Sequence, residues 1–152
     1  MKSYRFALQT VLDYRGEQVN LIQQKVAEVE QKRVAILQRI EEYDQAIGAA
    51  FLEQQQSLQE TVLDITRARN FPGYLWNLRQ QRFQEYQKLQ EAERHLAVVR
   101  EQLKQAQLKK RSLEVLKEKD YIKYKQKVEK AEEEFMSEIA LNRLRQPHPL
   151  NS

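Results

Sequence analysis

The side chains best suited to metal binding or acid–base chemistry are two histidines, His95 and His148, which lie far apart along the chain. Either kind of site needs histidines, cysteines or carboxylates that converge on one point. The sequence has no cysteine, and its three scattered glycines cannot form a phosphate-binding loop. The many carboxylates are interspersed with lysines and arginines in segments that we expect to be exposed helix. We therefore predict that the protein is not an enzyme and has no catalytic residue, cofactor or metal.

A second chemical feature is the basic cluster Lys109-Lys110-Arg111. Such a cluster can bind nucleic acid or a protein, or it can be a solvated helix face with acidic partners at i,i+4, such as Glu114 for Lys110. The sequence has no motif for reading a groove or stacking bases. These observations favour a solvated face or a protein contact, and we expect no nucleic-acid partner.

Large apolar side chains gather near the middle of the chain. Phe71, Tyr74 and Trp76 are close in sequence, and Tyr43 and Phe51 approach them from the end of the first of two predicted helical arms. Two interpretations remain open. The group either fills a thin core where two helices meet, or it forms an exposed docking patch, because Trp and Tyr are enriched at binding hot spots.

The elements that position these groups are long helices. Charged residues make up 32% of the chain, and only three Pro and three Gly are present, a composition typical of extended helices. An apolar stripe in alternating steps of three and four residues predicts a coiled-coil seam in each arm. In the first arm, at about 4–50, it runs through Leu8, Leu12, Arg15, Val19, Ile22, Val26, Val29, Arg33, Ile36, Ile40, Tyr43 and Ile47. In the second arm, at about 74–145, it runs through Leu75, Leu78, Arg82, Glu85, Leu89, Ala92, Leu96, Val99, Leu103, Ala106, Lys110 and Leu113.

The segment between the arms, at about 48–73, is predicted to be an irregular tip. The stripe shifts by one residue at Gly48 and continues through Phe51 and Leu58. Ser57-x-x-Glu60 resembles a capping box for a new helix. Asn70-Phe71-Pro72-Gly73 is expected to break the helix, because proline lacks an amide donor.

These features predict an all-α fold, a long two-helix antiparallel coiled-coil hairpin with an irregular tip, comprising residues 1–146. Residues 147–152, which contain two prolines, are predicted to be a disordered tail. No run of about 18 apolar residues and no signal-peptide pattern is visible, so we expect a soluble, cytoplasmic protein.

Four segments resemble the FliJ family in order and spacing. Tyr4–Arg15 follows the pattern F-x-L-x-x-V-L-x-x-R, and Tyr74–Leu78 is similar to the Y-L-x-x-L run that starts the family's second arm. Leu113–Lys119 with the following Tyr124 resembles L-E-x-L-K-E-K…Y, and Glu134–Arg143 resembles the family's acidic, Ala- and Arg-containing terminus. The resemblance extends over nearly the whole chain.

The resemblance implies a stalk or adaptor of a flagellar-type (type III) protein export apparatus. Its terminal end would enter the export ATPase hexamer, and its tip would reach the export gate, with export chaperones as further partners. It would meet the inner membrane only through these partners. The implied gate-facing residues are Ile40, Tyr43, Ile47, Tyr74 and Leu78. The implied ATPase-facing residues are Arg5, Arg15, Lys109, Lys110, Arg111 and Lys117. The alternatives are a coiled-coil scaffold or chaperone-like adaptor of another secretion or motility system, and a weak nucleic-acid-binding rod.

Overall fold

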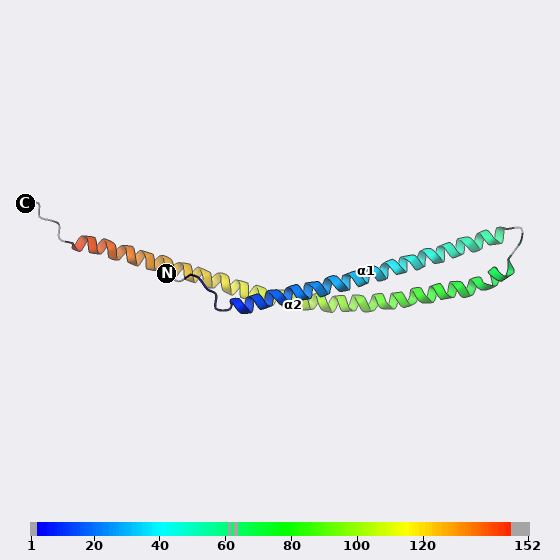
Figure 1. Ribbon diagram of the computed structural model, residues 1–152, viewed down its shortest axis with the longest axis horizontal. Coiled ribbons are helices and arrows are strands. Elements are labelled where there is room, and N and C mark those ends of the chain that lie inside the picture. Colours follow the sequence, from blue (N-terminus) through cyan, green and yellow to red (C-terminus); the bar gives the residue numbers. More distant parts are fainter. Residues whose placement is uncertain (1–2, 61, 63, 147–152) are drawn as a thin grey trace, which may run out of the picture. The chain divides into compact units, whose positions relative to one another are not determined.

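Two long helices form the fold. The computed structural model describes residues 3–60, 62 and 64–146. Helix α1 (Gln9–Gln59) and helix α2 (Ile65–Arg145) run antiparallel, and no strand occurs among the described residues (Figure 1). The chain reverses between Gln59 and Ile65. The predicted all-α antiparallel hairpin is therefore confirmed.

The chain divides into two compact units, and each contains part of both helices. Unit 1 consists of Met1–Val19 with Ala106–Ser152, and unit 2 consists of Asn20–Gln105. The buried apolar residues of both units are those of the predicted seam, and Ala50 of unit 2 is buried in addition to them. Leu12, Val19 and Ala106 are buried in unit 1, and Val29, Ile36, Ile40, Ile47, Leu78, Leu96 and Val99 are buried in unit 2. A stripe in steps of three and four stays on one side of a helix, so the apolar side chains of each helix pack against those of the other.

Ion pairs between the helices fix their register in unit 2. They join an arginine on one helix to a carboxylate on the other, mostly at the exposed flanks of the seam. Exposed pairs of this kind stabilise a protein by only about 0–1 kcal/mol each. Their regular placement nevertheless selects one alignment of the two helices. The pairs are Arg82–Asp44 at 2.8 Å, Arg100–Glu30 at 2.6 Å, Arg39–Glu85 at 3.6 Å, Arg33–Glu93 at 3.8 Å and Arg67–Glu53.

The prediction that residues 70–73 break the helix is wrong. Helix α2 begins at Ile65 and continues through Pro72 without interruption. Pro72 is exposed, whereas Phe71 and Leu75 are half-buried and Leu78 is buried. The proline ring therefore points away from the seam, and the loss of one amide donor is offset by the apolar residues that pack on either side of it.

The predicted shift of the seam at Gly48 is also wrong. The steps of three and four continue from Ile47 to Ala50, Gln54 and Ser57, which are buried or half-buried, and Phe51 and Leu58 are left exposed. Small and polar side chains occupy the seam here because the apolar ones lie one position further along. The apolar pattern near the tip therefore marks a surface and not the core.

The predicted capping box at Ser57 is replaced by a cap at Asp64. Ser57 is buried inside α1 and does not begin a helix. Asp64 directly precedes α2, and its Oδ1 accepts a hydrogen bond from the backbone N–H of Arg67 at 3.2 Å. This is the usual N-cap geometry, in which an aspartate satisfies an amide of the first helical turn. The predicted disordered tail at 147–152 lies outside the described residues.

Candidate functional site

The described residues contain no group of three or more His, Cys, Asp or Glu side chains able to hold a metal ion. Over the same residues, no helix is long and apolar enough to cross a membrane. His95 is exposed on α2.

The residues predicted to face the export gate do not form one surface. Ile40, Ile47 and Leu78 are buried in the seam of unit 2, where they hold the two helices together. Tyr43 is half-buried, and Tyr74 is 53% exposed. Of the five, Tyr74 is the one whose side chain is open to a partner, and the binding role of the set remains a prediction.

An aromatic face flanks the seam of unit 2, formed by Phe51, Trp76, Phe83 and Tyr86. The three α2 residues follow steps of seven and three along the helix, so they project from the same side of α2. Arg79, which lies between Trp76 and Phe83 on that side, stacks over the ring of Phe51 at 5.8 Å from its centroid. All four aromatic side chains are exposed, Trp76 at 62%.

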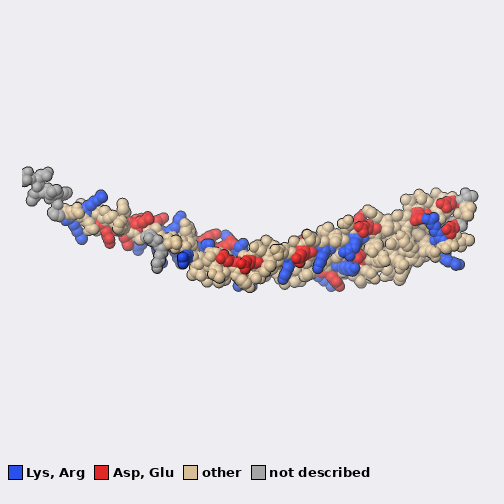
Figure 2. Space-filling model, viewed as in Figure 1, with Lys and Arg blue, Asp and Glu red and all other residues tan. Residues whose placement is uncertain are grey.

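Near the turn, part of the surface of unit 2 that Figure 2 shows carries no charged side chain. Exposed apolar residues that share one face, as the aromatic face does, are typical of a protein contact. Sequence analysis singled out Phe51 and Trp76 but missed Phe83 and Tyr86. The recurrence of large aromatics one position after the seam residues could have revealed them.

A groove of about 300 Å³ lies near the turn of unit 2 and is called the tip groove here. The rings of Phe71 and Phe51 pack in a T-shaped arrangement, with centroids 5.7 Å apart, and an ion pair joins Arg67 to Glu53 across the two helices. Tyr74 stands at its rim. The lining residues are Ala50, Glu53, Gln54, Ser57, Arg67, Asn70, Phe71 and Tyr74. In the predicted aromatic group, Phe71 is half-buried while Phe51, Tyr74 and Trp76 are exposed, and the docking role of the exposed rings stays a prediction.

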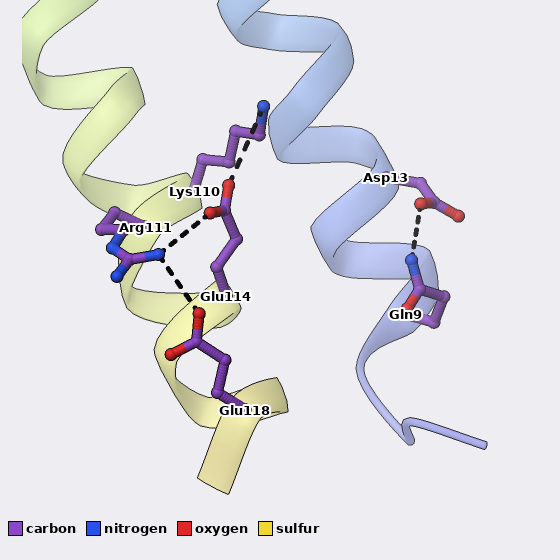
Figure 3. A network of polar contacts seen from close by, with 6 residues as sticks. All are labelled: Gln9, Asp13, Lys110, Arg111, Glu114 and Glu118. Atoms are coloured by element: carbon purple, nitrogen blue, oxygen red, sulfur yellow. Dashed lines mark hydrogen bonds and ion pairs between the residues drawn. The ribbon is translucent and has the colours of Figure 1, made fainter. Parts of the chain in front are cut away.

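The predicted basic cluster in unit 1 is largely neutralised by its own helix. Lys110 pairs with Glu114 at 3.8 Å, and Arg111 pairs with Glu114 at 3.3 Å and with Glu118 at 3.4 Å (Figure 3). These carboxylates follow the cluster by three, four and seven residues, so they lie on the same helix face. This arrangement matches the i,i+4 pairing of Lys110 with Glu114 that the spacing indicated, and Glu118 adds a second contact to Arg111.

The other basic residues predicted to face the ATPase differ in their surroundings. Lys117 is half-buried, and its Nζ donates a 2.7 Å hydrogen bond to Gln9 Oε1 on α1. Arg15 is half-buried beside the ring of Tyr14, whereas Arg5 and Lys109 are exposed. All six residues of the predicted set belong to unit 1.

Tyr4 anchors the segment that precedes α1 to α2. Its hydroxyl donates to Asp120 Oδ2 at 3.1 Å and lies 3.3 Å from the carbonyl oxygen of Lys117. Its ring packs on Tyr121 and Tyr124, with centroids 5.1 and 5.3 Å away. Partial burial, together with the hydrogen bond to Asp120, raises the pKa of Tyr4 above its ordinary value of 10.0. The phenol therefore remains protonated at neutral pH and keeps its role as a donor.

A wide groove of about 680 Å³, called the terminal groove here, lies beside this anchor in unit 1. It is lined by Ser3, Tyr4, Arg5, Asp120, Lys123, Tyr124 and Lys127. Sequence analysis named Arg5 alone among these residues as a candidate binding residue, because Arg5 and the lysines are separated by almost the whole hairpin in the sequence. Nothing in the local pattern shows that they share a groove.

Comparisons with known proteins identify the family. The family model described as Flagellar FliJ protein matches residues 4–148. The search of curated proteins and the search of solved structures found no match. The matched range includes both helices, the aromatic face and the described part of the terminal groove from Tyr4 onward. With its antiparallel helices and a family match over nearly all of its length, this chain belongs to the FliJ family of flagellar export proteins.

Proposed function

We propose that this protein is a stalk or adaptor of the flagellar export apparatus that contacts an export ATPase hexamer through unit 1 and the export gate through unit 2. It would act at the cytoplasmic face of the inner membrane and reach that membrane through its partners. Membership of the flagellar export family supports the setting. The exposed aromatic face of unit 2 is the observation that carries the docking mechanism.

Unit 2 offers a gate partner two neighbouring surfaces. The aromatic face has four large exposed rings, and the tip groove, with Tyr74 at its rim, has a hollow the size of one or two side chains. Aromatic side chains supply large contact areas while losing little conformational entropy, so a few of them can dominate a binding energy. The buried residues Ile40, Ile47 and Leu78 would act through the helix packing that presents these rings.

Unit 1 offers a different kind of surface. Lys110 and Arg111 are paired with carboxylates of α2, so a partner would have to displace those contacts to use them. Arg5 and Lys109 are exposed without a described ion pair. Two chemically different surfaces in two units fit a protein that joins two partners, and such a role needs no catalytic residue.

The test measures both contacts with the full chain. Binding to the soluble part of the cognate gate protein is measured for the unaltered chain, for Trp76→Ala on the aromatic face and for Tyr74→Ala at the tip groove. A hot-spot residue is worth about 2 kcal/mol or more, so at least one of the two variants should weaken binding by about tenfold or more. Stimulation of the cognate ATPase hexamer is measured in parallel and should be lost when residues 1–12 are deleted.

Val98→Ala is a matched control for the unit 2 variants. Val98 is 55% exposed on the same helix and in the same unit, but outside both surfaces. This variant should bind the gate protein as the unaltered chain does. The gate contact would be disproved if neither Trp76→Ala nor Tyr74→Ala weakened binding more than Val98→Ala, and the ATPase contact would be disproved if the unaltered chain gave no stimulation.

A further inference from the structure

The terminal groove of unit 1 brings together three cations from two distant segments. Arg5 comes from the segment before α1, and Lys123 and Lys127 lie one turn apart on α2. The anchor at Tyr4 holds the first segment against α2, through its hydroxyl and through its ring contacts with Tyr121 and Tyr124. The cations therefore meet because of a specific packing arrangement and not because of their spacing in the sequence.

These three cations have no acidic partner among the described residues. Among the described residues of unit 1, the ion pairs involve Lys110 and Arg111, and none involves Arg5, Lys123 or Lys127. Asp120 is the carboxylate in the groove lining, and it accepts the hydrogen bond of the Tyr4 hydroxyl. The groove thus has an excess of positive charge that its own side chains leave unpaired, in contrast to the neutralised cluster at Lys110 and Arg111.

The lining fits a peptide better than a nucleic acid. The two rings that line the groove, Tyr4 and Tyr124, are half-buried and pack on each other, so they offer little open face for stacking bases. Asp120 repels phosphates and carboxylates alike, but its remaining lone pairs can accept the backbone N–H groups that a peptide has and a sugar–phosphate backbone lacks. Ser3 adds a hydroxyl that can donate or accept. Cations with a few mixed polar groups are suited to carboxylates on a polypeptide chain.

We propose that the terminal groove binds an acidic segment of a protein partner, with Arg5, Lys123 and Lys127 contacting its carboxylates. The proposal deepens the function given above and rests on it only for the identity of the partner, the export ATPase. Arg5 can form a bidentate pair with a carboxylate, whereas the two lysines act as mobile point charges. Binding should therefore be fast and sensitive to salt.

The experiment uses the full chain and a labelled ten-residue peptide of alternating glutamate and glycine, followed by fluorescence anisotropy. A peptide with glutamine in place of glutamate and a ten-nucleotide single-stranded DNA serve as comparison probes. The test variant is Lys123→Glu/Lys127→Glu. The matched control, Lys25→Glu/Lys104→Glu, makes the same change in net charge at two exposed lysines of unit 2 that have no described ion pair.

We expect the acidic peptide to bind more tightly than either comparison probe. The groove variant should weaken that binding by about tenfold or more, and the control variant by about twofold or less. Circular dichroism should show the same helix content and melting temperature for both variants. Equal weakening by the two variants would show that overall charge alone attracts the peptide and would overturn the proposal. Tighter binding of the DNA would overturn the choice of ligand.

Stimulation of the cognate ATPase separates this inference from the proposed function. If the groove variant loses both peptide binding and ATPase stimulation, both are supported. If peptide binding depends on the groove but the unaltered chain does not stimulate the ATPase, the groove stands and the proposed function fails. If the unaltered chain stimulates the ATPase while peptide binding is independent of the groove, the groove proposal fails and the function stands.

Discussion

Glu85 shows how a single residue of the seam can oppose stability. It occupies a buried position of α2 with 6% exposure, between seam residues Arg82 and Leu89. Its Oε1 contacts Lys88 Nζ at 3.2 Å and Arg39 Nη1 at 3.6 Å, and its Oε2 has no hydrogen-bond partner among the described residues. Burying a carboxylate costs free energy that these two half-exposed cations offset only in part.

We predict that Glu85→Leu stabilises the hairpin. Leucine would complete the apolar stripe, while Arg39 and Lys88 would regain full hydration, because both are largely exposed. Replacing buried ion pairs by apolar residues has stabilised other proteins by about 1–4 kcal/mol, and the low end of that range is expected here. Thermal unfolding followed by circular dichroism measures the effect. Glu91→Leu, an exposed position on the same helix, should leave the melting temperature nearly unchanged, and a lower melting temperature for Glu85→Leu would show that the carboxylate is needed in the seam.

At the scale of the element, the start of α2 depends on Asp64. Its carboxylate satisfies the backbone N–H of Arg67, while the backbone N–H of Ala68 bonds to the carbonyl oxygen of Asp64 at 3.1 Å. The first turn of α2 lies upstream of Pro72, whose missing amide weakens the helix there. The hydrogen bond from the Arg67 N–H to the Asp64 carboxylate therefore stabilises a first turn that is weakened by the proline after it.

We predict that Asp64→Ala frays the first turn of α2, whereas Asp64→Asn does not. Alanine removes the acceptor and should cost about 1 kcal/mol locally, and asparagine retains it because Asn caps helices about as well as Asp. Hydrogen exchange of the amides at 65–70 is the measurement, with the amides of the α2 segment at 96–106 as an internal reference. Equal exchange in the two variants would indicate that tertiary packing alone sets the start of the helix.

At the scale of the whole molecule, pairing of the helices is a property of each unit. Arg100 pairs with Glu30 in unit 2, and Lys117 pairs with Gln9 in unit 1, so each unit contains its own long-range contact. The seam packing that accompanies these contacts requires the chain to reverse. A single straight helix would separate residues 30 and 100 by about 105 Å.

We predict short distances between spin labels in both units. The chain has no cysteine, so Glu30→Cys/Arg100→Cys and Gln9→Cys/Lys117→Cys each introduce one defined pair of label sites. Double electron–electron resonance measures the distance between the two labels. We expect this distance to equal the separation of adjoining helices, whose axes lie about 10 Å apart, plus the length of the label side chains. Dilution with unlabelled protein should leave these distances unchanged, because both sites are on one chain. Distances near those of a straight rod would rule out the hairpin.

The sequence alone determined the seam and the pairing of the arms. Steps of three and four between apolar residues are a local property that needs no partner to be recognised. Leu12, Val29, Ile36 and Val99 were therefore predicted to lie in the seam, and all four are buried. A long helix with one apolar stripe must cover that stripe, and two such stripes on one chain with a turn between them can cover each other.

Only the tertiary structure decided how α2 begins and which residues are available to partners. The propensity of Pro72 to end a helix was outweighed by the packing of Phe71 and Leu78, a contribution that local propensities do not contain. The same packing buries Ile40 and Ile47 and exposes Phe51 and Trp76. Likewise, Arg5 meets Lys123 and Lys127 because helix register and the Tyr4 anchor align segments that are distant in the sequence. Register is a relation between two helices, so the pattern along either helix alone cannot specify it.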